Sequence, residues 1–246
     1  MKTYLVIFSF FLIGSSFASD GIPDLIIEEI QKGVYLHKSF SHIDGFGLVS
    51  SNGVVVVDEG KAFIVDTPWS DRDTQKLVEW IAEKNYDLLG SISTHSHEDR
   101  TAGIKWLNAN AIPTYASALT NSILHKQDKA LAKYTLEDIE SPIAGGLVEI
   151  FYPGGGHTID NIVVWLPKSK VLVGGCLVRS LAAKGLGYTG EAHIGNWSKS
   201  VDKVQSRYAD AKLVIPGHGK VGDTQLLLHT KTLAESAYNK LAEPTE

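Results

Sequence analysis

The segment Thr94–Arg100 has the sequence THSHEDR, and it decides how this chain folds and what it binds. It follows an apolar run, Leu88–Ser93, that predicts a buried strand, and it precedes a helix expected to begin near Thr101. His95 and His97 are two residues apart, so on a continued strand their side chains would point to the same side. Side chains placed where a strand gives way to a loop are held firmly and can still reach a ligand.

Three further potential metal ligands follow in the second half of the chain, each at the end of a predicted strand. They are His157 after Val148–Tyr152, Cys176 after Val171–Val173, and His218 after Leu213–Ile215. With His95, His97 and Asp99 they make six donors, enough for three protein ligands to each of two zinc ions with a position left open for water. We expect these strand ends to converge on one edge of the fold.

The residues beside these ligands support the interpretation. His157 lies in the segment Gly154–Thr158, Cys176 follows Gly174 and Gly175, and His218 lies in Pro216–Gly219. Glycine allows the backbone to approach a site closely. A lone histidine at a strand end is more often a hydrogen-bonded structural residue than a ligand, so the prediction rests on the whole set.

The composition indicates one enzyme domain. The chain has 246 residues, 43% of them hydrophobic and 21% charged, which is long enough to bury a large core. Its net charge of −5 and the absence of a long basic run argue against a nucleic-acid partner. Each half of the chain has strands followed by helices, which suggests two sheets packed face to face with helices outside.

Local patterns predict individual elements. Ser70 and Asp73 have the spacing of a capping box and predict a helix over residues 70–84. Asn52 and Gly53 together predict a hairpin turn. Two further helices are expected over residues 196–208 and 223–241.

The first residues are typical of a cleavable signal peptide. Lys2 precedes the apolar stretch Tyr4–Ile13, and Ser16 and Ala18 supply the small residues that a signal peptidase reads. We therefore expect a signal peptide at residues 1–18 and a single domain at residues 19–246, exported to the periplasm without a membrane anchor. Cys176 is the only cysteine, so an internal disulfide is impossible and metal ligation explains an unprotected thiol in an oxidising compartment.

The chain resembles the metallo-β-lactamases of subclass B1, dizinc enzymes whose α/β fold is a four-layer αββα sandwich. The shared motifs are Gly33–Tyr35, Asp66–Pro68, His95–Arg100, Phe151–Thr158, Asp160–Asn161, Val164–Pro167, Gly174–Cys176 and Pro216–Gly219. The resemblance implies two Zn²⁺, the first bound by His95, His97 and His157 and the second by Asp99, Cys176 and His218. It also implies a monomer.

The activity implied by the resemblance is hydrolysis of the β-lactam amide bond by a zinc-bound hydroxide that Asp99 orients. Penicillins, cephalosporins and carbapenems are the expected substrates, and resistance to these antibiotics the consequence. Arg179 stands where the family usually has a lysine three residues after the cysteine, and is expected to bind the substrate carboxylate, with Lys184 as a second candidate. Tyr188 replaces a usual asparagine credited with binding the substrate carbonyl. Phe46, in the flap loop of relatives, is expected to contact an apolar substrate group.

Other readings stay open at this point. Glyoxalase II, lactonases and zinc-dependent nucleases share the sandwich, but they have a ligating histidine after the aspartate and usually a bridging aspartate at the position of Cys176. Here Arg100 follows Asp99, and a guanidinium cannot bind zinc but can orient the aspartate and the thiolate from outside the metal shell. An exported zinc-binding or storage protein is the non-enzyme alternative.

Overall fold

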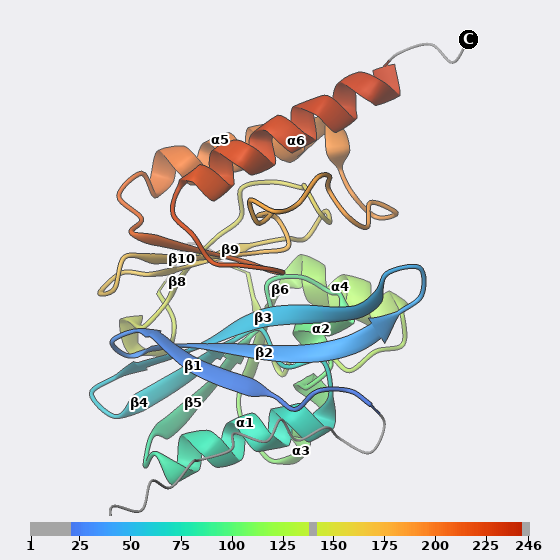
Figure 1. The fold of residues 1–246 in the computed structure, drawn as a ribbon. Helices are drawn as coiled ribbons and strands as arrows, with labels where there is room; N and C mark the ends of the chain where they lie inside the picture. The colour runs from blue at the N-terminus through green and yellow to red at the C-terminus, as the bar shows by residue number, and fades with distance from the viewer. Residues whose placement is uncertain (1–20, 138–141, 243–246) are drawn as a thin grey trace, which may run out of the picture.

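The described strands form two mixed sheets that pack face to face (Figure 1). The computed structural model describes residues 21–137 and 142–242. Within them, the larger sheet has the order β1-β2-β3-β4-β5-β6-β7 and the smaller one the order β11-β10-β9-β8. The larger sheet comprises β1 (Ile26–Gln31), β2 (Val34–Ile43), β3 (Gly47–Asp58), β4 (Lys61–Val65), β5 (Asp87–Ile92), β6 (Thr114–Ser117) and β7 (Tyr134–Leu136). The smaller sheet comprises β8 (Glu149–Phe151), β9 (Val163–Leu166), β10 (Val171–Gly175) and β11 (Leu213–Pro216).

Helices cover the outer face of each sheet (Figure 1). They are α1 (Asp71–Glu83), α2 (Glu98–Thr101), α3 (Ile104–Ala109), α4 (Ala118–Lys126), α5 (Ile194–Arg207) and α6 (Gln225–Ala242), with a 3₁₀ turn at Ala144–Gly146. α1 packs on the larger sheet, and α5 and α6 pack on the smaller one. The layers therefore run helix, sheet, sheet, helix, and the predicted αββα sandwich is confirmed.

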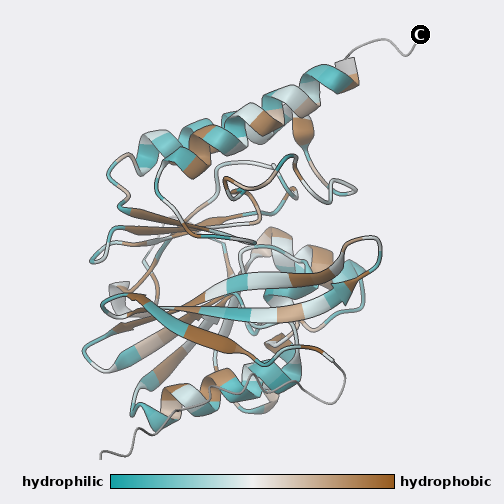
Figure 2. Cartoon of the chain, viewed as in Figure 1, coloured by the Kyte–Doolittle hydropathy of each residue, from teal (hydrophilic) through white to brown (hydrophobic). Residues whose placement is uncertain are grey.

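The alternation of side chains along the strands explains these layers. Val54 and Val56 of β3 point into the core between the sheets, whereas Val55 points to α1. Val164 of β9 points into the same inter-sheet core, whereas Val163 points to α5 and α6. Both faces of these strands are buried, so they read as continuous apolar runs. In Figure 2 the strands of the smaller sheet are largely brown, while α5 and α6 carry both brown and teal residues.

The hairpin predicted at Asn52 and Gly53 is wrong, because both residues lie inside β3. The chain instead turns between Ile43 and Gly47, which pair across β2 and β3. Asn52 is buried, and its side-chain amide donates to the carbonyls of Pro216 and Gly219 at 2.9 Å. This tertiary packing outweighs the turn preference of the dipeptide.

The capping prediction at Ser70 is confirmed: its hydroxyl accepts a hydrogen bond from the Asp73 amide at 3.1 Å, and α1 follows directly. The helix expected near Thr101 begins earlier, at Glu98, so Asp99 lies in its first turn. There a carboxylate is favoured by the helix dipole.

Two further expectations concern the signal peptide and a membrane anchor. The predicted signal peptide, residues 1–18, lies outside the residues that the structure describes. No helix in residues 21–137 and 142–242 has both the length and the apolar character needed to cross a bilayer.

Candidate metal centre

The six predicted ligands come together between the two sheets, each close to the end of a strand. His95, His97 and Asp99 follow β5 of the larger sheet, whereas the other three ligands, His157, Cys176 and His218, follow strands of the smaller sheet. Backbone hydrogen bonds join the two sides next to the ligands. The Ile162 amide donates to the Thr94 carbonyl at 2.8 Å, and the Asn52 amide donates to the Gly217 carbonyl at 2.9 Å.

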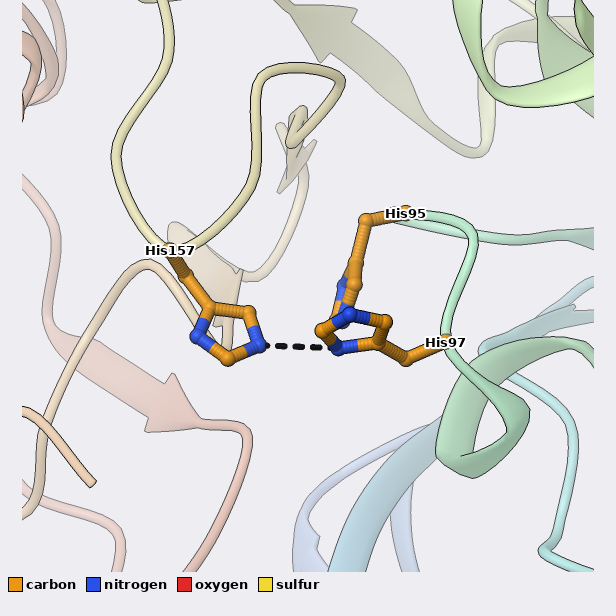
Figure 3. A group of neighbouring side chains, drawn as sticks. All are labelled: His95, His97 and His157. Carbon is orange, nitrogen blue, oxygen red and sulfur yellow. Dashed lines mark hydrogen bonds between the residues drawn. The ribbon is translucent and has the colours of Figure 1, made fainter. Parts of the chain in front are cut away.

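Three imidazoles form the first group of donors (Figure 3). His97 Nδ1 lies 3.1 Å from His157 Nε2, and the ring of His95 lies 4.7 Å and 4.9 Å from the rings of His97 and His157. One donor atom from each of the three lies within 4.8 Å of the others. His95 Nε2 is buried and has no hydrogen-bond partner among the described residues. A buried, unpartnered nitrogen aimed at two other imidazoles fits a metal ion better than any protein contact here.

Burial keeps two of these imidazoles, His95 and His157, neutral. It lowers the pKa of His157 to about 3, with a further contribution from His97. It also holds the pKa of His95 well below its usual range, and His157 adds to the effect. A neutral imidazole has the lone pair that metal ligation requires, so His95 and His157 can bind a cation at neutral pH.

The second group joins a carboxylate, a thiol and an imidazole. Cys176 Sγ lies 3.3 Å from His218 Nε2 and 3.4 Å from Asp99 Oδ2, and the last two atoms lie 3.2 Å apart. Asp99 Oδ1 lies 3.9 Å from His95 Nε2, so the two groups are adjacent. His218 is oriented by its other nitrogen, Nδ1, which donates to the Ser50 carbonyl at 2.7 Å. Thiolate, carboxylate and imidazole are all zinc donors.

A fully buried guanidinium neutralises this second group. Arg100 Nη2 lies 2.8 Å from Asp99 Oδ2 and donates to Cys176 Sγ at 3.1 Å and to the Gly217 carbonyl at 2.9 Å. Nη1 lies 3.2 Å from Asp66 Oδ2. Burial alone raises the pKa of Asp99, but Arg100 and His218 outweigh it and hold that pKa well below its usual range. Arg100 therefore contacts two of the candidate ligands, Asp99 and Cys176, through one nitrogen of its guanidinium.

The electrostatics of His218 differ from those of the first group. Burial lowers its pKa, but Cys176 and Asp99 raise it more, to about 10. Without a cation, His218 therefore carries the proton that balances its two acidic neighbours. A metal ion would take the place of that proton, which fits the second group to a cation.

Glu191 is a contact that sequence reasoning missed. Its Oε2 lies 2.6 Å from His97 Nε2. A carboxylate accepts a hydrogen bond from Nε2–H, which leaves the lone pair of Nδ1 pointing at His157. The two residues are 94 positions apart, and no spacing in the sequence relates them. Trp69, also missed, places its ring 6.0 Å from that of His218.

The four predicted substrate contacts are placed unequally. Tyr188 is exposed, with its ring 5.8 Å from that of His97. Arg179 is half-buried and its guanidinium packs against Gly187, where an added Cβ would lie 3.0 Å from Nη2. Burial lowers the pKa of Arg179. Phe46 and Lys184 are exposed, and no described hydrogen bond or ring contact joins either to the metal-binding residues.

Comparison with known proteins agrees with this geometry. A model of the metallo-beta-lactamase superfamily matches residues 46–218, and the chain belongs to that superfamily. A Pseudomonas aeruginosa protein named metallo-beta-lactamase type 2 is 44% identical over 230 residues, which cover 94% of this chain and 92% of the relative. A Bacillus cereus protein of the same name is 40% identical over 209 residues, covering 84% and 81%. The crystal structure of DIM-1 metallo-beta-lactamase exposed to ceftazidime has a TM-score of 0.87 at 64% identity, covering 88% and 99%.

Proposed function

We propose that this chain hydrolyses the amide bond of β-lactams with the help of two zinc ions and so confers resistance to these antibiotics. The observation that carries the proposal is the adjacency of two complete donor groups, His95, His97 and His157 on one side and Asp99, Cys176 and His218 on the other. The names of its relatives in the superfamily support the choice of substrate. Penicillins, cephalosporins and carbapenems are the proposed substrates.

The residues present fit zinc. Neutral imidazoles and a carboxylate–thiol–imidazole set are ligand sets that zinc accepts, and three protein ligands leave a position open. When bound, zinc supplies Lewis acidity, which polarises a carbonyl and activates a water molecule. The unpartnered Nε2 of His95 and the protonated His218 are the two features that a bound cation would resolve.

Asp99 is proposed to orient the attacking water. Its Oδ2 contacts Arg100 and His218, whereas its Oδ1 faces His95 between the two groups. The strongly lowered pKa of Asp99 keeps it ionised and makes it a weak base. Its proposed role is therefore to accept a hydrogen bond from water and align it, and not to store the proton that is released.

Arg179 is proposed to anchor the substrate carboxylate. Its backbone amide donates to Thr230 Oγ1 at 2.8 Å, which fixes the start of the side chain against α6. A guanidinium can hold a carboxylate with two parallel hydrogen bonds. Lys184, which is exposed, is the weaker candidate for this role. Phe46 is proposed to contact an apolar group of the substrate, and Tyr188 to donate a hydrogen bond from its phenol to the substrate carbonyl.

The decisive test is hydrolysis of a chromogenic cephalosporin by the purified protein. Activity is expected with zinc, should disappear after chelation and dialysis, and should return when zinc is restored. Metal analysis should give two zinc ions per chain at saturation. A thioester and a lactone tested in parallel address the rival enzymes. Hydrolysis of the thioester but not of the cephalosporin would contradict the proposal, as would a saturating stoichiometry of one.

We also propose that residues 1–18 are removed on export and that residues 19–246 act in the periplasm as a monomeric single domain. The small residues before Ser19 support this cleavage site. N-terminal sequencing of protein recovered from the periplasm should begin at Ser19. Sedimentation analysis should give a single species of monomer mass.

A further inference from the structure

We propose that His37 is a positioning residue for the second donor group, acting through the carbonyl of Asp66 and the guanidinium of Arg100. The inference rests on the proposed function, because it concerns the site assigned there to the second zinc ion. His37 is remote from that site in sequence and contacts none of the six candidate ligands in the described hydrogen bonds.

His37 holds the Asp66 carbonyl from within the larger sheet. It lies in β2, its side chain is buried, and its Nε2 lies 3.0 Å from the Asp66 oxygen. A carbonyl can only accept, so Nε2 carries the hydrogen. Nδ1 is buried and has no hydrogen-bond partner among the described residues. The ring is therefore a neutral donor with one partner, and burial supports this state by lowering the pKa of His37 to about 3.

The space around His37 is shaped for this ring. Gly53 is its register partner in β3. A Cβ at Gly53 would lie 2.3 Å from His37 Nε2 and 2.7 Å from the Asp66 oxygen. Any larger residue would push the imidazole off the carbonyl. Gly53, which the sequence pattern misassigned to a turn, thus serves the close approach of His37 to Asp66.

The orientation of Asp66 determines where its carboxylate points. Asp66 has a φ of 64°, a left-handed conformation that is uncommon for residues other than glycine, although aspartate adopts it more readily than most. Its amide donates to the Ile92 carbonyl at 2.8 Å, and its own carbonyl accepts from His37. These two hydrogen bonds fix both the backbone amide and the backbone carbonyl of Asp66.

The Asp66 carboxylate then links this backbone to the site. Oδ1 accepts from the Thr94 amide at 2.7 Å, directly before His95, and Oδ2 lies 3.2 Å from Arg100 Nη1. The other arm of Arg100 contacts Asp99 and Cys176. A path of three contacts therefore leads from the His37 ring to each of the two acidic candidate ligands of the second group, Asp99 and Cys176. It reaches one residue of the first group, His95, through the Thr94 amide that precedes it and through the Thr94 hydroxyl, which donates to Asp66 Oδ2 at 3.0 Å and lies 3.4 Å from His95 Nδ1.

The path predicts a selective effect on metal binding. Loss of the His37 donor leaves the Asp66 carbonyl buried without a partner and frees the strained residue to rotate, which moves the carboxylate away from Arg100. Outer-shell partners of metal ligands typically change metal affinity by about 10 to 100-fold. We expect this loss for the second ion and a smaller loss for the first, because the path reaches two residues of the second group through Arg100 and only His95 of the first group through Thr94.

The experiment compares three variants by stepwise titration of the metal-free protein with Zn²⁺ and with Co²⁺. His37→Phe keeps the ring volume and removes the donor. His37→Gln places an amide donor near the position of Nε2, whereas His37→Asn is too short to do so. Chelator competition gives both zinc affinities, and the thiolate-to-cobalt charge-transfer absorption reports Cys176 ligation separately from activity.

A matched control separates positioning from general destabilisation. Asn121 is buried and donates to the Ala132 carbonyl at 3.1 Å and to Thr135 Oγ1 at 2.8 Å, away from both donor groups. Asn121→Leu should lower the melting temperature but leave both zinc affinities within about threefold of the parent, a change of less than about 1 kcal/mol.

The outcomes are distinct. Weaker binding of the second ion and a weaker charge-transfer band in His37→Phe and His37→Asn, with recovery in His37→Gln, support the proposal. Parental affinity for the second ion in His37→Phe or His37→Asn overturns it, whatever their stability, as does an equal loss in Asn121→Leu. If the parent protein itself binds one ion or fails to hydrolyse the cephalosporin, the proposed function fails instead.

Discussion

The two donor groups of the site differ in the charge of their side chains. The first consists of three imidazoles packed closely together, two of which, His95 and His157, are buried and have lowered pKa values. The second brings Asp99 and Cys176 together within 3.4 Å. Two acidic groups so close need a cation, and the fold provides Arg100 behind them.

This difference determines how strongly each donor group depends on the residues that surround it. A neutral group needs only that its rings face one another, and one polar contact from Glu191 orients His97. A charged group needs a buried counter-charge, which in turn needs its own partners, Asp66 and the Gly217 carbonyl. Distant substitutions should therefore act on the second group more than on the first.

The largest effect should come from Arg100→Met, which removes the buried cation and keeps most of the side-chain volume. Asp99 and Cys176 then lack compensation, and breaking a buried ion pair costs about 3–5 kcal/mol. Urea unfolding of the metal-free protein measures the loss. Lys231→Met is the control, since Lys231 pairs with the partly exposed Asp202, and an ion pair at the surface contributes little to stability. Equal losses in both variants would contradict the difference drawn between the groups.

Cys176→Ser tests whether affinity for the second zinc ion can be lost while the first ion stays bound. A neutral hydroxyl replaces a soft thiolate, so affinity for the second ion should fall by about 100-fold or more, beyond the usual loss from outer-shell changes. The first ion should bind as in the parent. Zinc titration with chelator competition measures both. Full occupancy of both sites at limiting zinc would show that Cys176 is not a ligand.

Arg179→Ala tests whether the positive charge of Arg179 binds the substrate carboxylate. Zinc content should stay the same, while kcat/KM for carboxylate-bearing β-lactams falls by about 10-fold or more, mainly through KM. Arg179→Lys should recover part of the loss because a point charge remains. Lys184→Ala is the matched control and should change little. The reverse pattern would assign the anchor to Lys184.

A pH dependence of stability in the metal-free protein should also distinguish the two groups. The pKa of His157 is lowered from 6.5 to about 3, so its contribution is complete above pH 6.5 and is lost as the pH falls towards 3. The pKa of His218 is raised from 6.5 to about 10, so its contribution is complete below pH 6.5 and is lost as the pH rises towards 10. The difference in unfolding free energy between the parent and His157→Gln should rise with pH between pH 3 and pH 6.5. The difference between the parent and His218→Gln should fall with pH between pH 6.5 and pH 10. Slopes of the same sign would contradict the contrast between the groups.

The sequence was sufficient for the architecture and for the choice of the six candidate ligands. Apolar runs with turn residues between them predicted most strands, and the Ser70 cap predicted the start of α1. The ligand roles stay predictions, although the structure brings the six side chains together.

What the sequence did not predict depends on contacts between distant segments. Nothing in the dipeptide Asn52–Gly53 shows that Gly53 will face His37 inside a strand. Glu191 reaches His97 across 94 residues, and β7 is a three-residue strand with no periodicity to detect. Each of these features is set by packing of the two halves, which a local pattern does not contain.

The position of the donors between the two sheets has a mechanical consequence. His97 and His157 are 60 residues apart in sequence, and Asp99 and Cys176 are 77 apart. An ion held by each group would tie these segments together, as a cross-link does, in a chain whose single cysteine rules out an internal disulfide. Each ion present at 100 times its dissociation constant would add about 2.7 kcal/mol to stability. The zinc supply would then govern how long the protein survives heat and proteases, as well as how fast it works.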